Sequence, residues 1–148
     1  MVIKLEQQES LRDIEILISY PKMSKNVEHI VSIIKSVDIK IAGLTNDGFE
    51  LINASDILYI ESIDDKTHIF CEKNNYQIKE RLYNIYEKLK NVGFIQINKY
   101  CILNIRKLYR VRTLKNSHLE AVLFNGNSLY VTRKYLAEMK HKLREMLV

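Results

Sequence analysis

Basic residues alternate with asparagine, tyrosine and hydroxyl side chains in the last third of this chain. Four short clusters have this composition: Asn98-Lys99-Tyr100, Arg106-Lys107, Tyr109-Arg110-Val111-Arg112 and Thr132-Arg133-Lys134-Tyr135. Lys and Arg neutralise phosphates, and Asn and Arg also form bidentate hydrogen bonds with base edges in the major groove of DNA. The clusters therefore favour binding to a nucleic acid. Those at 108–113 are equally suited to cross-strand pairing on a solvated sheet face.

The charge distribution supports the same interpretation. The formal net charge is +5. Residues 1–93 hold 12 Lys and Arg against 15 Asp and Glu, whereas residues 94–148 hold 11 against 3, a net charge of +8. A basic block confined to one third of a sequence is typical of a surface that binds a polyanion. A solvated basic face without a partner would have the same composition.

Few residues suggest catalysis or metal binding. The four histidines are scattered, and the sequence has no His-x-x-x-His or Cys-x-x-Cys motif. Asp64 and Asp65 could hold Mg²⁺ near His68 for phosphodiester chemistry, but an Asp-Asp-Lys sequence is typical of a solvated hairpin turn. Cys71 and Cys101 lie in apolar runs, where a cysteine usually behaves as a small hydrophobic residue. We expect neither an enzyme nor a bound metal or other cofactor.

The sequence is also typical of a cytoplasmic protein. Two cysteines 30 residues apart form neither a disulfide framework nor a metal knuckle. The N-terminus shows no secretory signal, and the longest apolar runs are only a few residues. We therefore expect no direct membrane insertion.

A small strand–helix–strand unit is expected at the N-terminus. Residues 14–20 alternate and are rich in β-branched side chains, which predicts a strand that ends at Pro21. Ser24 is a suitable N-cap for an amphipathic helix that reaches Val37, and a returning strand follows at 39–45. We assign residues 1–44 to this N-terminal cap, which we expect to pack on the rest of the chain.

The remainder, residues 45–148, has the pattern of short strands joined by tight turns. Asn46-Asp47-Gly48 and Asn125-Gly126 are strong hairpin signals, and Gly93 is suited to a helix C-terminus. The fold class predicted is α+β, mainly β, with an antiparallel scaffold and short helices. Helices are expected at 80–92 and 133–147, and strands at 49–53, 56–62, 67–73, 76–79, 94–97, 101–105, 108–113, 118–124 and 128–131.

Three of these segments carry recognisable signatures. Residues 56–61 have the sequence Asp-Ile-Leu-Tyr-Ile-Glu, residues 94–105 begin Phe-Ile-Gln-Ile-Asn-Lys-Tyr, and residues 129–136 contain Val-Thr-Arg-Lys-Tyr. In this order they resemble the D-I-x-Y-I-E, F-x-R-x-H-x-S-x-x-V-N and V-S-R-x-Y signatures of the LytTR family of bacterial DNA-binding domains. The resemblance covers roughly residues 45–148. Gln96, Asn98 and Tyr100 replace the usual Arg, His and Ser, so the resemblance does not predict the operator sequence.

The resemblance implies that loops on a β scaffold, rather than a recognition helix, enter successive major grooves of double-stranded DNA. Matching positions imply base contacts in the neighbourhood Lys66, Thr67 and His68, at Lys99, and at Arg133. Phosphate contacts are expected from Asn98, Tyr100, Lys107, Lys134 and Tyr135. The three base-contacting places are about 33 residues apart, so only folding can bring them together.

The functional hypothesis is a sequence-specific transcription regulator of the stand-alone LytTR type, since 44 residues are too few for a receiver domain. We expect a homodimer on repeated DNA half-sites, because one small domain that touches few bases rarely reaches specific affinity. The N-terminal cap could mediate this association, or bind a regulatory membrane protein, or complete the core. An RNA-binding module and, less favoured, a metal-dependent phosphodiester-processing enzyme are the alternatives.

Overall fold

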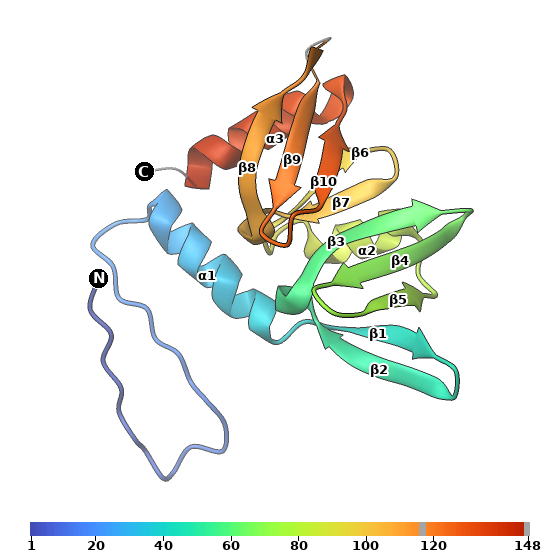
Figure 1. Cartoon of the computed structure of the whole chain (residues 1–148). Coiled ribbons are helices and arrows are strands. Elements are labelled where there is room, and N and C mark those ends of the chain that lie inside the picture. The colour runs from blue at the N-terminus through green and yellow to red at the C-terminus, as the bar shows by residue number, and fades with distance from the viewer. Residues whose placement is uncertain (116–117, 147–148) are drawn as a thin grey trace.

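Antiparallel hairpins build most of this molecule, which a computed structural model describes over residues 1–115 and 118–146 (Figure 1). Within those residues the larger sheet has seven strands in the order β2-β1-β5-β4-β3-β7-β6. Their bounds are β1 Lys40–Thr45, β2 Gly48–Asn53, β3 Ile57–Ile63, β4 Lys66–Cys71, β5 Asn75–Ile78, β6 Phe94–Asn98 and β7 Cys101–Asn104. Every pairing between neighbours is antiparallel.

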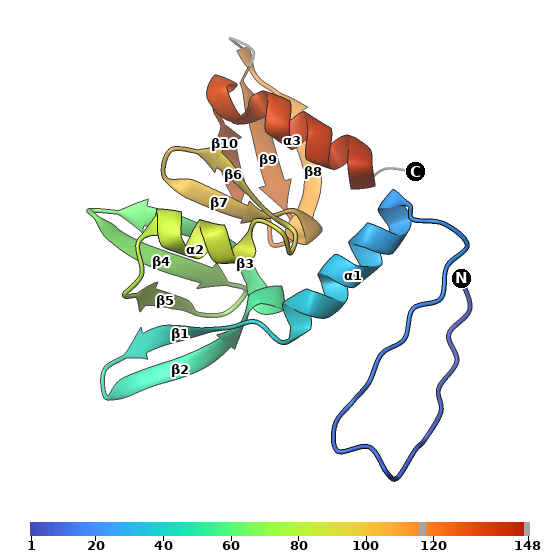
Figure 2. The same ribbon diagram turned by 180° about the vertical axis from the view of Figure 1, so that it is seen from behind.

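A smaller sheet follows, and in the described part of the chain it has three strands in the order β10-β9-β8. They are β8 Leu108–Thr113, β9 Leu119–Leu123 and β10 Ser128–Val131. The helices are α1 Lys25–Val37, α2 Leu82–Leu89 and α3 Arg133–Met146, with short 3-10 turns at Ala54–Asp56 and Ile105–Lys107. Figure 2 shows from behind that α2 covers the larger sheet and α3 the smaller one.

The hydrophobic core has two parts that meet at β3, β6 and β7. In the first, the large sheet packs against α2 through side chains such as Ile60, Ile85 and Phe94. In the second, Leu103 and Ile97 pack with the small sheet and Met139 of α3. Because alternate residues of a strand point to opposite faces, β6 and β7 contribute side chains to both parts. These strands therefore belong to both parts of the core.

Local turn chemistry explains the hairpins. Asp64 and Asp65, between β3 and β4, have φ angles of 51° and 61°. Asp tolerates the left-handed region better than most residues, and a two-residue turn with positive φ at both positions matches the twist of the strands. The sequence-based prediction of a turn here is confirmed, as are the antiparallel fold class and the N-cap of α1, where Ser24 Oγ accepts from Val27 N.

The strand predicted at 14–20 does not form. Residues 1–24 run away from both sheets in Figures 1 and 2, and the side chains of Ile14 and Leu17 are 87% and 88% exposed. The returning strand is present as β1, but β2 and β5 occupy both of its edges, so no edge of β1 is left for residues 14–20. The expected strand–helix–strand cap is therefore wrong in its first element. The position 44/45 lies within β1, and the division of the chain there stays a prediction.

Candidate nucleic-acid interface

The β6–β7 turn presents the first group of predicted DNA contacts. Asn98 ends β6 and Cys101 begins β7, so that Lys99 and Tyr100 form the turn between them. Asn98 Oδ1 accepts a hydrogen bond of 2.9 Å from the Tyr100 backbone N–H, which fixes the turn. Lys99 is exposed, and its Nζ lies 5.5 Å from the centre of the Tyr100 ring, which is itself 54% exposed. The turn thus offers an ammonium group and an aromatic hydroxyl to a ligand.

The start of α3 lies directly beside this turn. The Thr132 N–H donates to the Ile97 carbonyl over 3.0 Å, and Asn98 Nδ2 donates to the Tyr130 carbonyl over 2.9 Å. Arg133 and Lys134 are exposed in the first turn of α3, and Lys134 Nζ lies 5.6 Å from the centre of the Tyr135 ring. The positive end of a helix dipole adds to these side-chain charges. Two of the three predicted contact regions are therefore neighbours.

The β3–β4 hairpin reaches the same place from the other side. The Ser62 N–H donates to the Tyr100 carbonyl over 2.8 Å, and Glu61 pairs with Cys101 in the sheet. Lys66 is exposed at the start of β4, next to the exposed Asp64 and Asp65. Because two carboxylates flank one ammonium, this hairpin attracts phosphates less than the other two regions do.

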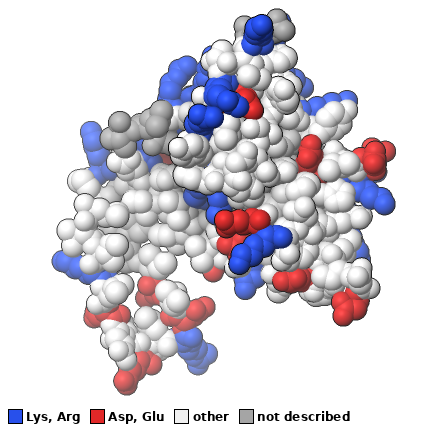
Figure 3. All heavy atoms as spheres, in the orientation of Figure 1, with Lys and Arg blue, Asp and Glu red and all other residues white. Residues whose placement is uncertain are grey.

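The three regions line one side of the molecule, at the right of Figure 1 and the left of Figure 2. The folded chain thus brings to one side of the molecule the segments that hold Lys66, Lys99 and Arg133, which the sequence separates by about 33 residues at each step. Figure 3 shows Lys and Arg over the part that holds the small sheet and α3, with acidic and basic side chains mixed elsewhere. We call the exposed surface formed by Lys66, Lys99, Tyr100, Arg133 and Lys134 the loop face.

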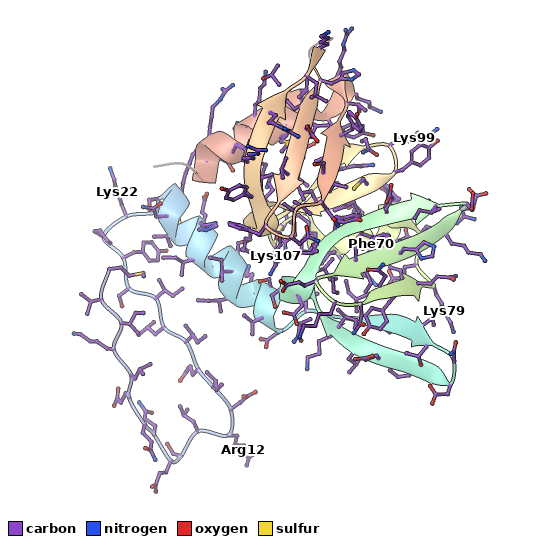
Figure 4. All side chains as sticks on the ribbon, viewed as in Figure 1. Arg12, Lys22, Phe70, Lys79, Lys99 and Lys107 are labelled. Atoms are coloured by element: carbon purple, nitrogen blue, oxygen red, sulfur yellow. The ribbon has the colours of Figure 1, made fainter. Side chains whose placement is uncertain are left out.

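Two of the predicted contacts do not belong to the loop face. Thr67 is only 4% exposed, because alternation along β4 turns it to the opposite face from Lys66 and His68. Lys107 follows β7 at the end opposite to Tyr100, where it shares a surface pocket with Asp56 and Cys71. Figure 4 shows Lys99 and Lys107 well apart. Thr67 and Lys107 thus lie outside the loop face, and their assignment as DNA contacts stays a prediction.

His68 and Tyr135 hold intermediate positions. His68 is half-buried in β4, opposite Glu61 and Gln77 in the neighbouring strands. Tyr135 is half-buried against the second part of the core. Both flank the loop face rather than project from it. Tyr130 of β10, 63% exposed beside the Asn98 side chain, is an additional candidate that the sequence analysis missed. Strand alternation could have indicated this candidate, because it places Tyr130 on the face opposite to the buried Val131.

Arg106 makes its hydrogen bonds within the protein and has a structural role. Its guanidinium donates to the Val92 carbonyl over 2.9 Å and to Ser32 Oγ over 3.0 Å, and its Nε is buried without a hydrogen-bond partner among the described residues. Burial lowers the pKa of this group from its ordinary value. The basic pair Arg106-Lys107 thus divides into a structural arginine and a lysine at the far end of β7.

The two cysteine thiols have little nucleophilic character. Burial, and secondarily the negative charge of Glu61, raises the pKa of Cys101 far above its ordinary value. Burial also raises the pKa of Cys71, with a smaller contribution from Asp56. The thiolate is the nucleophilic form, so neither residue has the character of a catalytic cysteine. Within the described residues no group of three His, Cys, Asp or Glu side chains could hold a metal ion.

Comparison with known proteins identifies the class to which this fold and loop face belong. Residues 47–144 match the model of the LytTr DNA-binding domain. The chain therefore belongs to the LytTR family of DNA-binding domains, as its three signatures predicted, and binding of DNA is the activity that defines this family.

Individual relatives place the chain more closely. It is 25% identical over 138 residues to the sensory transduction protein LytT of Bacillus cereus, over 90% of this chain and 56% of that protein. It is 31% identical over 109 residues to LytT of Enterococcus faecalis, over 74% of this chain and 44% of that protein. The chain thus spans about half the length of these relatives. An HTH-type transcriptional regulator of Staphylococcus aureus strain N315 is 25% identical over 97% of this chain and 95% of its own length.

A solved structure has the same fold. It is the LytTr DNA-binding domain of a Bacillus cereus protein described as a methyl-accepting/DNA response regulator. The two structures superimpose with a TM-score of 0.67 over 70% of this chain and 95% of the solved chain, at 22% sequence identity. In the part of this chain that the structure describes, no helix is long and apolar enough to cross a membrane.

Proposed function

We propose that this chain is a bacterial transcription regulator that binds a specific sequence in double-stranded DNA through its loop face. The observation that carries the proposal is the convergence of three separate turns at Tyr100. Its carbonyl accepts from Ser62, its N–H donates to Asn98, and Asn98 in turn bonds to β10 just before α3. Three exposed basic segments held in fixed relation can contact several base pairs at once.

Within the loop face the side chains divide by their chemistry. Arg133 and Lys99 are the proposed contacts to base edges, since both are exposed at the tips of their segments and both suit guanine O6 and N7. Lys66, with His68 behind it, is the third candidate for base contacts. Tyr100, Lys134 and Tyr135 are proposed to hold phosphates, which fixes the register of the protein on the duplex.

A role in transcription regulation is proposed from the relatives. The HTH-type transcriptional regulator of Staphylococcus aureus aligns with this chain over 95% of its own length. We propose that this chain likewise regulates transcription, in the cytoplasm where bacterial DNA lies.

We also propose that residues 14–20 associate with the same segment of a second copy. Large apolar side chains on this segment are exposed, among them Ile14, Leu17 and Ile16 at 87%, 88% and 57%. The apolar residues Ile33 and Val37 of the following helix α1 are also exposed, at 37% and 58%. Two copies that pair these segments would cover the apolar surface of both and place two loop faces on repeated half-sites. A membrane protein that docks on the same surface is the competing partner.

Selection of bound sequences from a randomised duplex library tests the proposed function. The wild-type chain is expected to enrich one motif, and a Lys99→Ala/Arg133→Ala variant to enrich none. Footprinting of the selected motif in the DNA upstream of the protein's own coding region then locates a natural site. Competition of the bound motif with single-stranded RNA of the same sequence distinguishes the duplex reader from an RNA-binding module, which would prefer the RNA. Failure to enrich any duplex motif would overturn the proposal.

A further inference from the structure

Asn98 uses both ends of its side-chain amide within the protein. Nδ2 donates to the Tyr130 carbonyl and Oδ1 accepts from the Tyr100 N–H, each over 2.9 Å. The orientation of the amide follows from its partners, because a carbonyl can only accept and a backbone N–H can only donate. One of its two donor hydrogens and one of its two acceptor lone pairs are therefore used within the protein before any ligand arrives.

An irregularity in the sheet directs Asn98 to these partners. The pairing of β6 with β7 shifts between Gln96 and Asn98, which is the signature of a β-bulge. A bulge inserts one residue and turns the following side chain in a new direction. Here the bulge lies where the Ile97 carbonyl accepts from Thr132, so that two successive residues of β6 bond to Thr132 and to Tyr130 of β10.

These bonds join the two main reading elements of the loop face. On one side of Asn98 lies the turn of Lys99 and Tyr100. On the other side lies Tyr130, three residues before Arg133. Within the described part of the chain, the Asn98 amide hydrogen-bonds to both the turn and β10. Together with the backbone bond from Thr132 to Ile97, it sets the distance between Lys99 and Arg133.

We propose that Asn98 is a positioning residue for DNA recognition, and not a phosphate contact as the sequence analysis expected. This proposal rests on the proposed function and adds a specific device to it. Asn98 holds the β6–β7 turn and the start of α3 at the spacing that the two base contacts require. A site whose groups are held in place before binding loses less conformational entropy and discriminates better between correct and incorrect sequences.

The first test compares Asn98→Ala with Asn91→Ala, which makes the same chemical change at an exposed residue before the opposite end of β6. For Asn98→Ala, affinity for the selected duplex should fall about tenfold, as expected for the loss of one or two hydrogen bonds. Affinity for random duplex and the salt dependence of binding should remain as in the wild type. Equal losses on both duplexes, with a salt slope reduced by about one phosphate, would show a phosphate contact and overturn the proposal.

A second test separates positioning from direct reading of a base. If Asn98 acts through Arg133, the double variant Asn98→Ala/Arg133→Ala should lose little more affinity than Arg133→Ala alone. Additive losses, together with relaxed specificity at one base pair of its own, would make Asn98 a base contact. Asn98→Asp provides a second variant in case the alanine variant does not fold, since Asp retains the acceptor for Tyr100 and lacks the donor for Tyr130. The added negative charge weakens binding to both duplexes, so its effect cancels in the ratio of affinity for the selected duplex to affinity for random duplex. This ratio should fall for Asn98→Asp as well.

A third readout needs no DNA. In the free protein, exchange of the Tyr100 amide hydrogen should accelerate severalfold in Asn98→Ala and remain unchanged in Asn91→Ala. Unchanged exchange in Asn98→Ala would refute the positioning role even if the protein binds its motif as proposed. Conversely, accelerated exchange in a protein that selects no duplex motif would locate the failure in the proposed function.

Discussion

Nη2 of Arg106 lies 3.0 Å from Oγ of Ser32, and this contact fastens α1 to the domain that carries the loop face. Nη1 of the same guanidinium donates to the Val92 carbonyl over 2.9 Å and approaches Ser36 Oγ at 3.5 Å. One half-buried side chain therefore joins α1, the segment after α2 and the 3-10 turn before β8. The N-terminal segment and the DNA-binding domain are mechanically connected through it.

The first prediction concerns this junction. Arg106→Lys should lower the free energy of unfolding by about 1–3 kcal/mol, because an ammonium group cannot bond to both Ser32 and Val92 with the geometry of a guanidinium. Denaturant unfolding followed by circular dichroism measures the change. Arg110→Lys, at an exposed position of β8, is the matched control and should stay within about 0.5 kcal/mol of the wild type. A similar small effect for both variants would contradict a structural role for Arg106.

The second prediction uses the glycine that accommodates this arginine. Gly93 has a φ angle of +97°, and a Cβ there would lie 2.9 Å from Cζ of Arg106. Gly93→Ala should therefore destabilise the fold by about 1–3 kcal/mol, through backbone strain and displacement of the guanidinium. Gly48→Ala is the control, since a Cβ at Gly48 meets no atom of the described residues within 4 Å. Equal melting temperatures for the two variants would exclude this close contact.

The sequence predicted the elements whose signals are local. Ser24 as N-cap, the hairpin turn at 46–48 and Gly93 after α2 all depend on residues within a few positions of one another. The strand at 14–20 was wrong because a strand also needs a free partner edge, and the sequence pattern does not show which edges other strands occupy. The position of Thr67 was predictable in principle, since alternation places it on the face of Ile69.

The loop face was predictable only in part. The resemblance to the LytTR signatures selected Lys99 and Arg133, and the structure places their segments side by side. The same signatures could not reveal that Lys107 lies beyond the far end of β7, because the basic composition around it is the same as in the true neighbours of Tyr100. Nor could they assign Asn98, whose two hydrogen bonds depend on a bulge and on a strand 32 residues away.

The third prediction is a salt dependence that distinguishes the loop face from the rest of the basic segment. Binding through the loop face should release counterions, and Lys134, its cation proposed to hold a phosphate, should contribute about one unit to the slope of log K against log salt. Titrations of a fluorescent duplex at several salt concentrations measure it. Lys134→Ala should reduce the steepness by about one phosphate, and Lys107→Ala should leave it unchanged. If the slope of log K against log salt becomes less steep by the same amount in both variants, Lys107 also contacts a phosphate.

The fourth prediction separates base reading from phosphate binding at the start of α3. Arg133→Ala should cost about 1–3 kcal/mol of binding free energy on the selected duplex and little on random duplex. Lys134→Ala, one residue further, should weaken both complexes nearly equally. Equilibrium binding of both variants to both duplexes provides the comparison. If Arg133→Ala weakens both complexes equally, Arg133 contacts phosphate only.

The fifth prediction concerns the two thiols. Because burial raises the pKa of Cys101 and of Cys71, both should react with a thiol reagent at pH 8 more slowly than a free cysteine, and Cys101 only as the protein unfolds. The folded-state pKa of each thiol lies above its unfolded value, so the unfolded protein loses the thiol proton at a lower pH than the folded protein does. The contribution of the thiols to the free energy of unfolding is therefore complete below the unfolded pKa and decreases as the pH rises above it. The free energy of unfolding should thus decline above about pH 9. Rapid labelling of Cys101 in the native protein would contradict the buried position of β7.

The last prediction tests the proposed association through residues 14–20. Ile16→Asp places a charge in the middle of the apolar segment, and Leu5→Asp places the same charge at a residue that is 95% exposed outside it. If the segment pairs with a second copy, the wild type and Leu5→Asp should bind a duplex with two half-sites as two protomers, and cooperatively. Ile16→Asp should lose the cooperativity and bind each half-site with the affinity of a single domain, because the linkage that raises the effective concentration is gone. Sedimentation with and without DNA gives the masses. One protomer per duplex at saturating wild-type protein would refute the dimer. If purified membrane vesicles retain the wild type but not Ile16→Asp, the segment binds a membrane partner instead.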